Sequence, residues 1–274
     1  MTGCIQARRW VLATVVTLLL PLFGTPAAHA QSGPDHSMGG MNMDRVIRTF
    51  ILAEQLELQP STADRPVNAE ILSWIGGDYR RLYLRAQGEQ STVGRGDGEL
   101  QADVLFGRLI TPFWSAVAGA RLDTRPQVSR SALLDVSGSA PPGSSRLTRA
   151  MLAVGFVGLA PGWFELEPTL LVSDAGDVSL EVESSFDLLL TQRLIVQPRV
   201  ELNAALQAVP EIGIGSGLND IEFGARMRYE IRRKFAPYVG VSWLRRTGAT
   251  AAMAHDAGET KSVGTVTAGV RVWR

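Results

Sequence analysis

Apolar and polar residues alternate strictly along several segments in the second half of the chain. Between residues 220 and 231, one set of alternate positions is apolar: Ile221, Phe223, Ala225, Met227, Tyr229 and Ile231. The positions between them carry Asp220, Glu222, Arg226, Arg228 and Glu230. The pattern recurs within residues 178–188 and 193–203. Because strand side chains point alternately to two faces, a period of two predicts strands with one apolar and one polar face.

Extending this pattern along the chain predicts twelve antiparallel strands. We expect them near residues 45–57, 68–75, 79–88, 98–109, 113–124, 147–159, 162–173, 177–189, 192–204, 218–231, 235–247 and 262–273. Strands of soluble sheets average about 5–6 residues, whereas tilted membrane-crossing strands need about 9–11. The expected fold class is therefore all-β, a single antiparallel transmembrane β-barrel of about 12 strands.

A large soluble sandwich or a lipocalin-like barrel would show the same alternation with its apolar faces turned inward. The connections favour the membrane barrel. Short ones at residues 75–78, 111–112, 160–162, 190–192 and 232–234 alternate with longer ones, except at 174–176. Short periplasmic turns opposite longer outer loops are typical of outer-membrane barrels, and an even strand count puts both termini in the periplasm. Aromatic residues near strand ends fit an interfacial girdle: Phe113, Trp114, Trp163, Phe164, Phe235 and Trp243.

The first 30 residues predict a cleaved secretory signal. Arg8 and Arg9 precede an apolar stretch at residues 10–23, and Ala28-His29-Ala30 fits the small-x-small cleavage pattern. The apolar stretch is short for the alternative, a membrane anchor. We expect residues 1–30 to be the signal, 31–44 a flexible segment and 45–274 the barrel, which places the protein in the outer membrane of a Gram-negative bacterium.

Composition excludes several other functions. Cys4, the only cysteine, lies in the predicted signal, so the mature chain has no thiol for a disulfide, a thiolate metal site or a nucleophile. Loss of Arg8 and Arg9 leaves a slight excess of acidic residues, which argues against a nucleic-acid partner. The expected partner of the outer barrel surface is outer-membrane lipid. No common hydrolase or nucleotide-binding motif is present, and no predicted strand carries a histidine. We therefore expect no enzyme activity.

The predicted flexible segment contains candidate metal ligands. His36, Met38, Met41 and Met43 lie within eight polar and Gly-rich residues that precede the first strand. Thioether sulfur favours Cu(I), and imidazole binds Cu(I) or Cu(II). The sequence therefore predicts a copper site, with Cu(I) preferred over Cu(II); the alternative is a linker with incidental methionines. Met253 and His255, in a predicted loop at 248–261, form a weaker candidate pair.

Many charged residues fall on the faces expected to point into the lumen. They are Arg81, Arg85, Asp103, Arg121, Asp123, Glu165, Glu167, Glu181, Glu183, Arg193, Arg199, Glu201, Glu222, Arg226 and Arg228. The simpler interpretation is a lattice of ion pairs in a solvated lumen. The alternative is a path for cations, since a twelve-stranded barrel is wider than the filled eight-stranded type and narrower than open porins.

Several stretches resemble the copper resistance protein B (CopB) family of outer-membrane proteins. They lie at residues 74–84, 112–114, 158–167, 186–203, 213–222 and 228–241. The most specific are Leu-Leu-Thr-Gln-Arg-Leu at 189–194 and Tyr-Glu-Ile-Arg-Arg at 229–233. The resemblance implies copper binding, copper tolerance and an outer-membrane location. The Met- and His-rich tract of the family is matched here only at His36, Met38, Met41 and Met43.

Two hypotheses for function follow. The first is a copper-binding barrel that sequesters periplasmic copper or moves it outward, with a periplasmic copper-handling protein as a candidate partner. The second is a structural or general-diffusion barrel in which residues 31–44 have no metal role. Deleting residues 31–43 and measuring copper binding and tolerance separates the two.

Overall fold

The chain forms an antiparallel β-barrel. The structure is a computed structural model that describes residues 47–60, 66–90, 98–126 and 146–274. Its strands are β1 (Arg48–Leu58), β2 (Val67–Gly76), β3 (Arg80–Gln90), β4 (Gly98–Thr111), β5 (Trp114–Pro126), β6 (Arg146–Ala160), β7 (Phe164–Ser173), β8 (Val178–Ser185), β9 (Leu188–Leu189), β10 (Leu194–Ala205), β11 (Gly217–Tyr229), β12 (Phe235–Arg246) and β13 (Ser262–Trp273). Helical structure in these ranges consists of the 3-10 helix η4 (Pro210–Ile212) and α2 (Gly248–Asp256).

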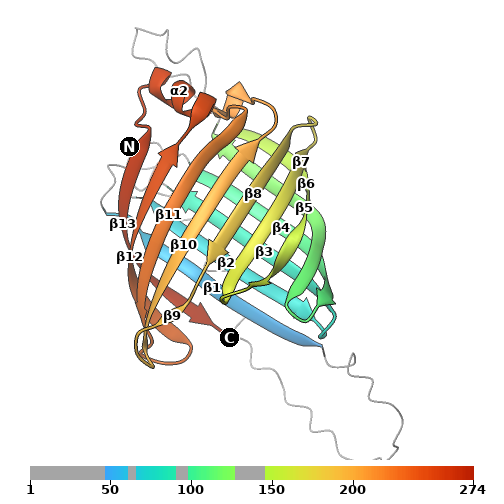
Figure 1. Ribbon diagram of the computed structural model, residues 1–274, viewed down its shortest axis with the longest axis vertical. Helices are drawn as coiled ribbons and strands as arrows, with labels where there is room; N and C mark the ends of the chain where they lie inside the picture. The colour runs from blue at the N-terminus through green and yellow to red at the C-terminus, as the bar shows by residue number, and fades with distance from the viewer. Residues whose placement is uncertain (1–46, 61–65, 91–97, 127–145) are drawn as a thin grey trace, which may run out of the picture. The chain divides into compact units, whose positions relative to one another are not determined.

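The barrel is closed, because each strand pairs with its neighbours and β13 pairs with β1 (Figure 1). β8 and β9 both pair with β10 and are separated only by Phe186 and Asp187, so they act as one interrupted strand. Counted this way, the barrel has twelve strands. The predicted fold class is confirmed, and the observed strands lie within a few residues of the predicted ranges. In the described ranges, neither helix has the length and hydropathy needed to cross a bilayer.

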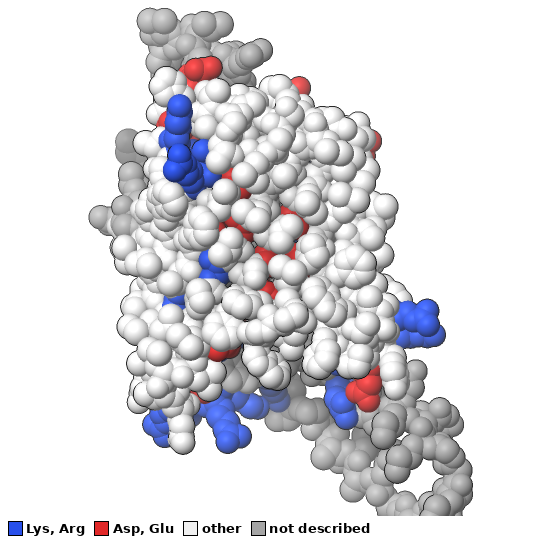
Figure 2. Space-filling view, in the orientation of Figure 1, with Lys and Arg blue, Asp and Glu red and all other residues white. Residues whose placement is uncertain are grey.

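The charged faces point into the lumen and the apolar faces point outward. Asp103 is 2% exposed and Arg121 is 5% exposed, whereas Leu152 and Val241 are each 58% exposed. Figure 2 shows the same division on one face: most Lys and Arg atoms lie toward the ends, and the middle is largely uncharged, with acidic and a few basic atoms visible between uncharged side chains. This orientation contradicts a soluble barrel with an apolar interior and fits a bilayer around the outer surface.

A β-bulge in β1 changes which residues face the lumen. The pairing of β1 with β2 shifts between Ala53 and Gln55, so that Glu54 is an extra residue. Leu52 faces inward before the bulge, and Gln55 and Glu57 face inward after it, with 5% and 2% exposure. A bulge inserts one residue and reverses the alternation beyond it. The bulge therefore brings an additional carboxylate into the lumen.

The two ends of the barrel differ. The strand β1 begins, and β13 ends, at the end where the short turns lie. The opposite end carries the longer connections, with η4 and α2 (Figure 1). Of the predicted girdle, five aromatic residues are exposed near strand ends and Trp114 is half-buried; the exposed ones are Phe113, Trp163, Phe164, Phe235 and Trp243.

Candidate functional site

The lumen contains ion pairs between neighbouring strands and between strands that are not neighbours. Arg85 on β3 lies 2.5 Å from Glu167 on β7. Arg121 on β5 makes a bidentate pair with Asp103 on β4, at 2.7 and 3.0 Å, and also contacts Glu181 on β8. The predicted lattice of ion pairs is therefore confirmed. Because the Arg85–Glu167 and Arg121–Glu181 pairs join strands that are not neighbours, they connect separate parts of the barrel wall through the lumen.

Arg199 on β10 lies at the centre of the largest group of lumenal charges. Its guanidinium is 3.0 Å from Glu183, 3.5 Å from Glu201 and 3.7 Å from Glu70. Glu183 and Glu201 lie on β8 and β10, whereas Glu70 reaches Arg199 from β2. One guanidinium is thus shared by three carboxylates.

Four of the lumenal carboxylates form a row across adjacent strands. Glu167 on β7 is directly opposite Glu183 on β8, which is opposite Glu201 on β10, which is opposite Glu222 on β11. Directly opposed like charges destabilise a sheet. We call these four residues the carboxylate row. Arginines reach only part of it, because no ion pair joins Glu222 to another residue in the described ranges.

A second buried carboxylate has two hydrogen-bond donors on one of its oxygens. Glu57 on β1 accepts hydrogen bonds from Arg226 Nε at 2.9 Å and from the Tyr238 hydroxyl at 2.8 Å. Its side chain is 2% exposed. In contrast, Glu70 Oε2 has no hydrogen-bond partner, although Glu70 is 5% exposed. Glu57 therefore has hydrogen-bond donors in the protein, whereas one carboxylate oxygen of Glu70 has none.

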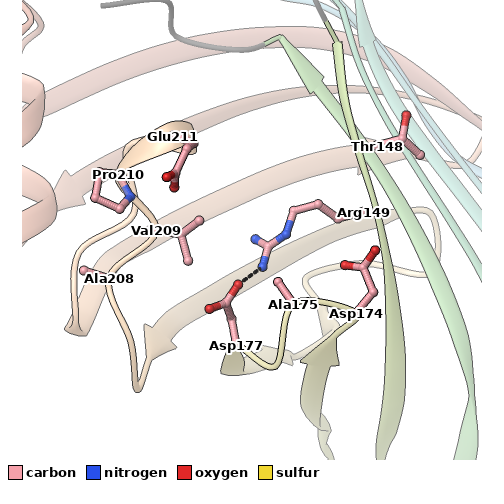
Figure 3. A pocket seen from close by; sticks show the side chains of 9 residues that line it. All are labelled: Thr148, Arg149, Asp174, Ala175, Asp177, Ala208, Val209, Pro210 and Glu211. Carbon is pink, nitrogen blue, oxygen red and sulfur yellow. Dashed lines mark hydrogen bonds and ion pairs between the residues drawn. The ribbon is translucent and has the colours of Figure 1, made fainter.

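A hollow of about 590 Å³ lies at the end of the barrel that carries the longer connections. Figure 3 shows Arg149 of β6 directed at Asp177, with Asp174 and Glu211 on either side. Arg149 and Asp177 form an ion pair, and Asp177 also contacts Ser173. The hollow is acidic, but its best-placed carboxylate already has a cation.

The predicted loop at 248–261 is wrong in part, because residues 248–256 form α2. The helix packs on the β10–β11 connection, where the backbone N–H of Gly215 donates to the Thr250 hydroxyl at 2.9 Å. Met253 and His255 both lie on α2, two positions apart. Residues at this spacing do not face each other on a helix, and the His255 side chain is 71% exposed. The helix therefore does not bring this pair together.

The predicted copper ligands lie outside the described residues. This holds for His36, Met38, Met41 and Met43, whose positions are in the range 1–46. Within the ranges that the structure describes, no three His, Cys, Asp or Glu side chains are arranged as a metal-ligand set.

The structure corrects one predicted lumenal residue and adds others. Arg193 is exposed in the turn before β10 and does not line the lumen. Sequence reasoning missed Glu57 and Glu70. The bulge in β1 hides the position of Glu57 from any simple alternation. Glu70 shares its face of β2 with Leu72 and Trp74, so that face does not look polar.

Comparisons with known proteins identify the family. Residues 47–274 match the model of the family described as Copper resistance protein B precursor (CopB). Copper resistance protein B of Escherichia coli is 40% identical over 231 residues, covering 84% of this chain and 71% of the relative. A copper resistance protein B homolog of Pseudomonas syringae pv. tomato is 36% identical over 249 residues, covering 91% of this chain and 77% of the relative. A solved KdgM porin in complex with disordered oligogalacturonate aligns with a TM-score of 0.42 and 8% identity, over 82% of this chain and 98% of the porin. On the family match and the two relatives, this chain belongs to the copper resistance protein B family, an outer-membrane β-barrel with a role in copper resistance.

Proposed function

We propose that the protein supports copper resistance by binding copper in the periplasm through the segment that precedes its barrel, and by sequestering that copper or moving it outward. Residues 1–30 act as a cleaved export signal in this proposal. Met38, Met41 and Met43 supply thioethers to one Cu(I), with His36 as a fourth ligand. The observation that carries the proposal is the family match over residues 47–274, which adds a role in copper resistance to a chain with three thioethers and one imidazole just before its first strand.

The periplasmic placement of both termini rests on the two unlike ends of the barrel. Strand β1 begins and β13 ends beside the short turns. Outer-membrane barrels usually have their short turns on the periplasmic side. With this orientation, residues 31–44 meet copper in the periplasm, where a copper-handling protein is a candidate donor. Thioethers suit that compartment because they do not form disulfides. The proposal includes no catalytic step.

Competition with a Cu(I) chelator tests the ligand assignment on the mature protein. Replacing Met38, Met41 and Met43 together by leucine should abolish Cu(I) binding at this site, because leucine keeps the bulk but lacks sulfur. Met227→Leu is the matched control, since Met227 is on the outer face of β11 and is 46% exposed. Unchanged Cu(I) affinity in the triple variant would favour the structural or general-diffusion barrel.

Sequestration and outward movement differ in what happens to the copper. Sequestration predicts that periplasmic copper stays bound to the protein in proportion to its amount. Outward movement predicts less periplasmic copper with little of it retained on the protein. Two kinds of cells are compared, those that produce the full protein and those that produce a variant lacking residues 31–43. Metal analysis of the periplasm and of the protein purified from each separates sequestration from outward movement.

A further inference from the structure

The carboxylate row contains more carboxyl groups than there are arginines in contact with it. Glu167, Glu183, Glu201 and Glu222 are directly opposed on neighbouring strands, and Glu70 faces the row through Arg199. Two guanidinium groups, those of Arg85 and Arg199, contact four of these five carboxylates, and Glu222 has no ion pair in the described ranges. Each directly opposed pair of like charges opposes folding of the sheet. A sheet that keeps three such pairs in succession is under a repulsion that a bound cation relieves.

The facing side of the lumen supplies a second observation. Glu70 is 5% exposed, and its Oε2 has no hydrogen-bond partner; the nearest cation is Arg199 Nη1, 3.7 Å away. Gln55 is opposite Glu70 in the β1–β2 ladder, and its Nε2 is also buried without a partner. Buried polar atoms in proteins are normally hydrogen-bonded, and the exceptions need a reason. A buried carboxylate oxygen that accepts no hydrogen bond, and whose cation lies 3.7 Å away, can accept a ligand.

We propose that the carboxylate row and Glu70 bind a hydrated divalent cation in the middle of the lumen. Carboxylate oxygens suit hard and borderline divalent ions such as Mn²⁺, in contrast to the soft thioethers proposed for Cu(I). The arginines hold the carboxylates apart, so the ion keeps part of its water shell and competes with Arg199 for Glu183 and Glu201. This site is separate from the proposed copper segment, and neither depends on the other.

The acidic hollow at the barrel end is the rival location. Its Asp177 is paired with Arg149, and Glu211 lies in the β10–β11 connection. That hollow has no buried carboxylate oxygen without a partner among those found in the described ranges. The row is therefore the better cation site, because it has more carboxyl groups and lies beside a buried carboxylate oxygen without a hydrogen bond.

Electron paramagnetic resonance of Mn²⁺ tests the proposal on the mature protein in detergent, since the signal of the free hydrated ion falls as the ion binds. Glu183→Gln and Glu201→Gln should each weaken Mn²⁺ binding about tenfold or more, because each removes a charge close to the ion. Glu165→Gln is the matched control: it makes the same change two residues from Glu167, outside the row. Arg199→Gln should act in the opposite direction and strengthen binding, because it removes the competing cation.

Each outcome decides the proposal. If Glu165→Gln weakens Mn²⁺ binding as much as the row variants do, the ion is attracted by diffuse lumenal charge and the proposal is wrong. If Glu211→Gln weakens Mn²⁺ binding and the row variants do not, the ion binds in the hollow and the proposal is wrong. Because the row variants and Arg199→Gln predict opposite changes, either one is decisive if the other does not fold. Replacing Met38, Met41 and Met43 by leucine should leave Mn²⁺ binding unchanged, so failure here is distinguishable from failure of the copper proposal.

Discussion

Arg199 on β10 and Glu70 on β2 face each other across the lumen, with Nη1 3.7 Å from Oε2. Their strands are separated by four others on the nearer side of the barrel. The pair is longer than a hydrogen bond, yet Arg199 is only 16% exposed and Glu70 is buried, at 6% exposure. Closure of the sheet brings these two charges together.

Arg199→Gln should lower the free energy of unfolding by about 3 kcal/mol, because it leaves Glu70, Glu183 and Glu201 without their shared cation. Urea unfolding of the protein folded in lipid vesicles measures this. Arg48→Gln is the control, since Arg48 pairs with Asp78 at the surface and is 62% exposed; its loss should be below about 1 kcal/mol. Similar losses for the two variants would mean that the lumenal lattice contributes no more than a surface pair.

Tyr238→Phe should lower the free energy of unfolding by about 1.5–3 kcal/mol, because it removes a hydrogen bond to the buried charge of Glu57. The hydroxyl–carboxylate distance is 2.8 Å, and Tyr238 is 6% exposed. Tyr79→Phe makes the same change at a residue that is 55% exposed and should have little effect. If both variants unfold at the same denaturant concentration, the Glu57 contact adds nothing to stability.

Val241→Arg and Ser242→Arg test which face of β12 meets lipid. Val241 is 58% exposed on the outside, and Ser242 follows it on the lumenal face. Arginine on the lipid face near the bilayer midplane costs about 2–4 kcal/mol. Ser242→Arg should be milder, since it places a cation in an acidic lumen. Folding titrations into bilayers compare the two, and a larger loss for Ser242→Arg would reverse the assignment of faces.

Thr250→Val should release α2 from the β10–β11 connection while leaving the barrel intact. Thr250 is 8% exposed, and its hydroxyl accepts from Gly215 N–H at 2.9 Å and lies 3.0 Å from Asn219 Oδ1. Losing these contacts leaves buried polar groups unpaired, which costs about 1–3 kcal/mol locally. Amide hydrogen exchange should quicken at Gly215 and along α2 and stay unchanged in β3 to β5. Thr260→Val is the exposed control; unchanged exchange in Thr250→Val would show that other contacts hold the helix.

The sequence by itself determined the strands, their two faces and the alternation of short and long connections. The strands and their faces follow from the period of two, which is a local property: a lipid exterior requires apolar residues at every second position. It also indicated the family, because the runs at 189–194 and 229–233 are specific. Even α2 has a local signal that the prediction did not use, since residues 248–256 contain four alanines and alanine favours helix.

Only the tertiary structure decided which charges meet. Glu70 and Arg199 are 129 positions apart, and nothing local to either residue encodes the other. Their contact depends on how the strands are staggered when the barrel closes, and that of Glu57 with Arg226 and Tyr238 depends also on the bulge in β1. Alternation specifies that a side chain points into the lumen, but barrel closure and strand register specify which other side chains it contacts. For this reason the carboxylate row, whose members lie on four neighbouring strands, became visible only in the folded barrel.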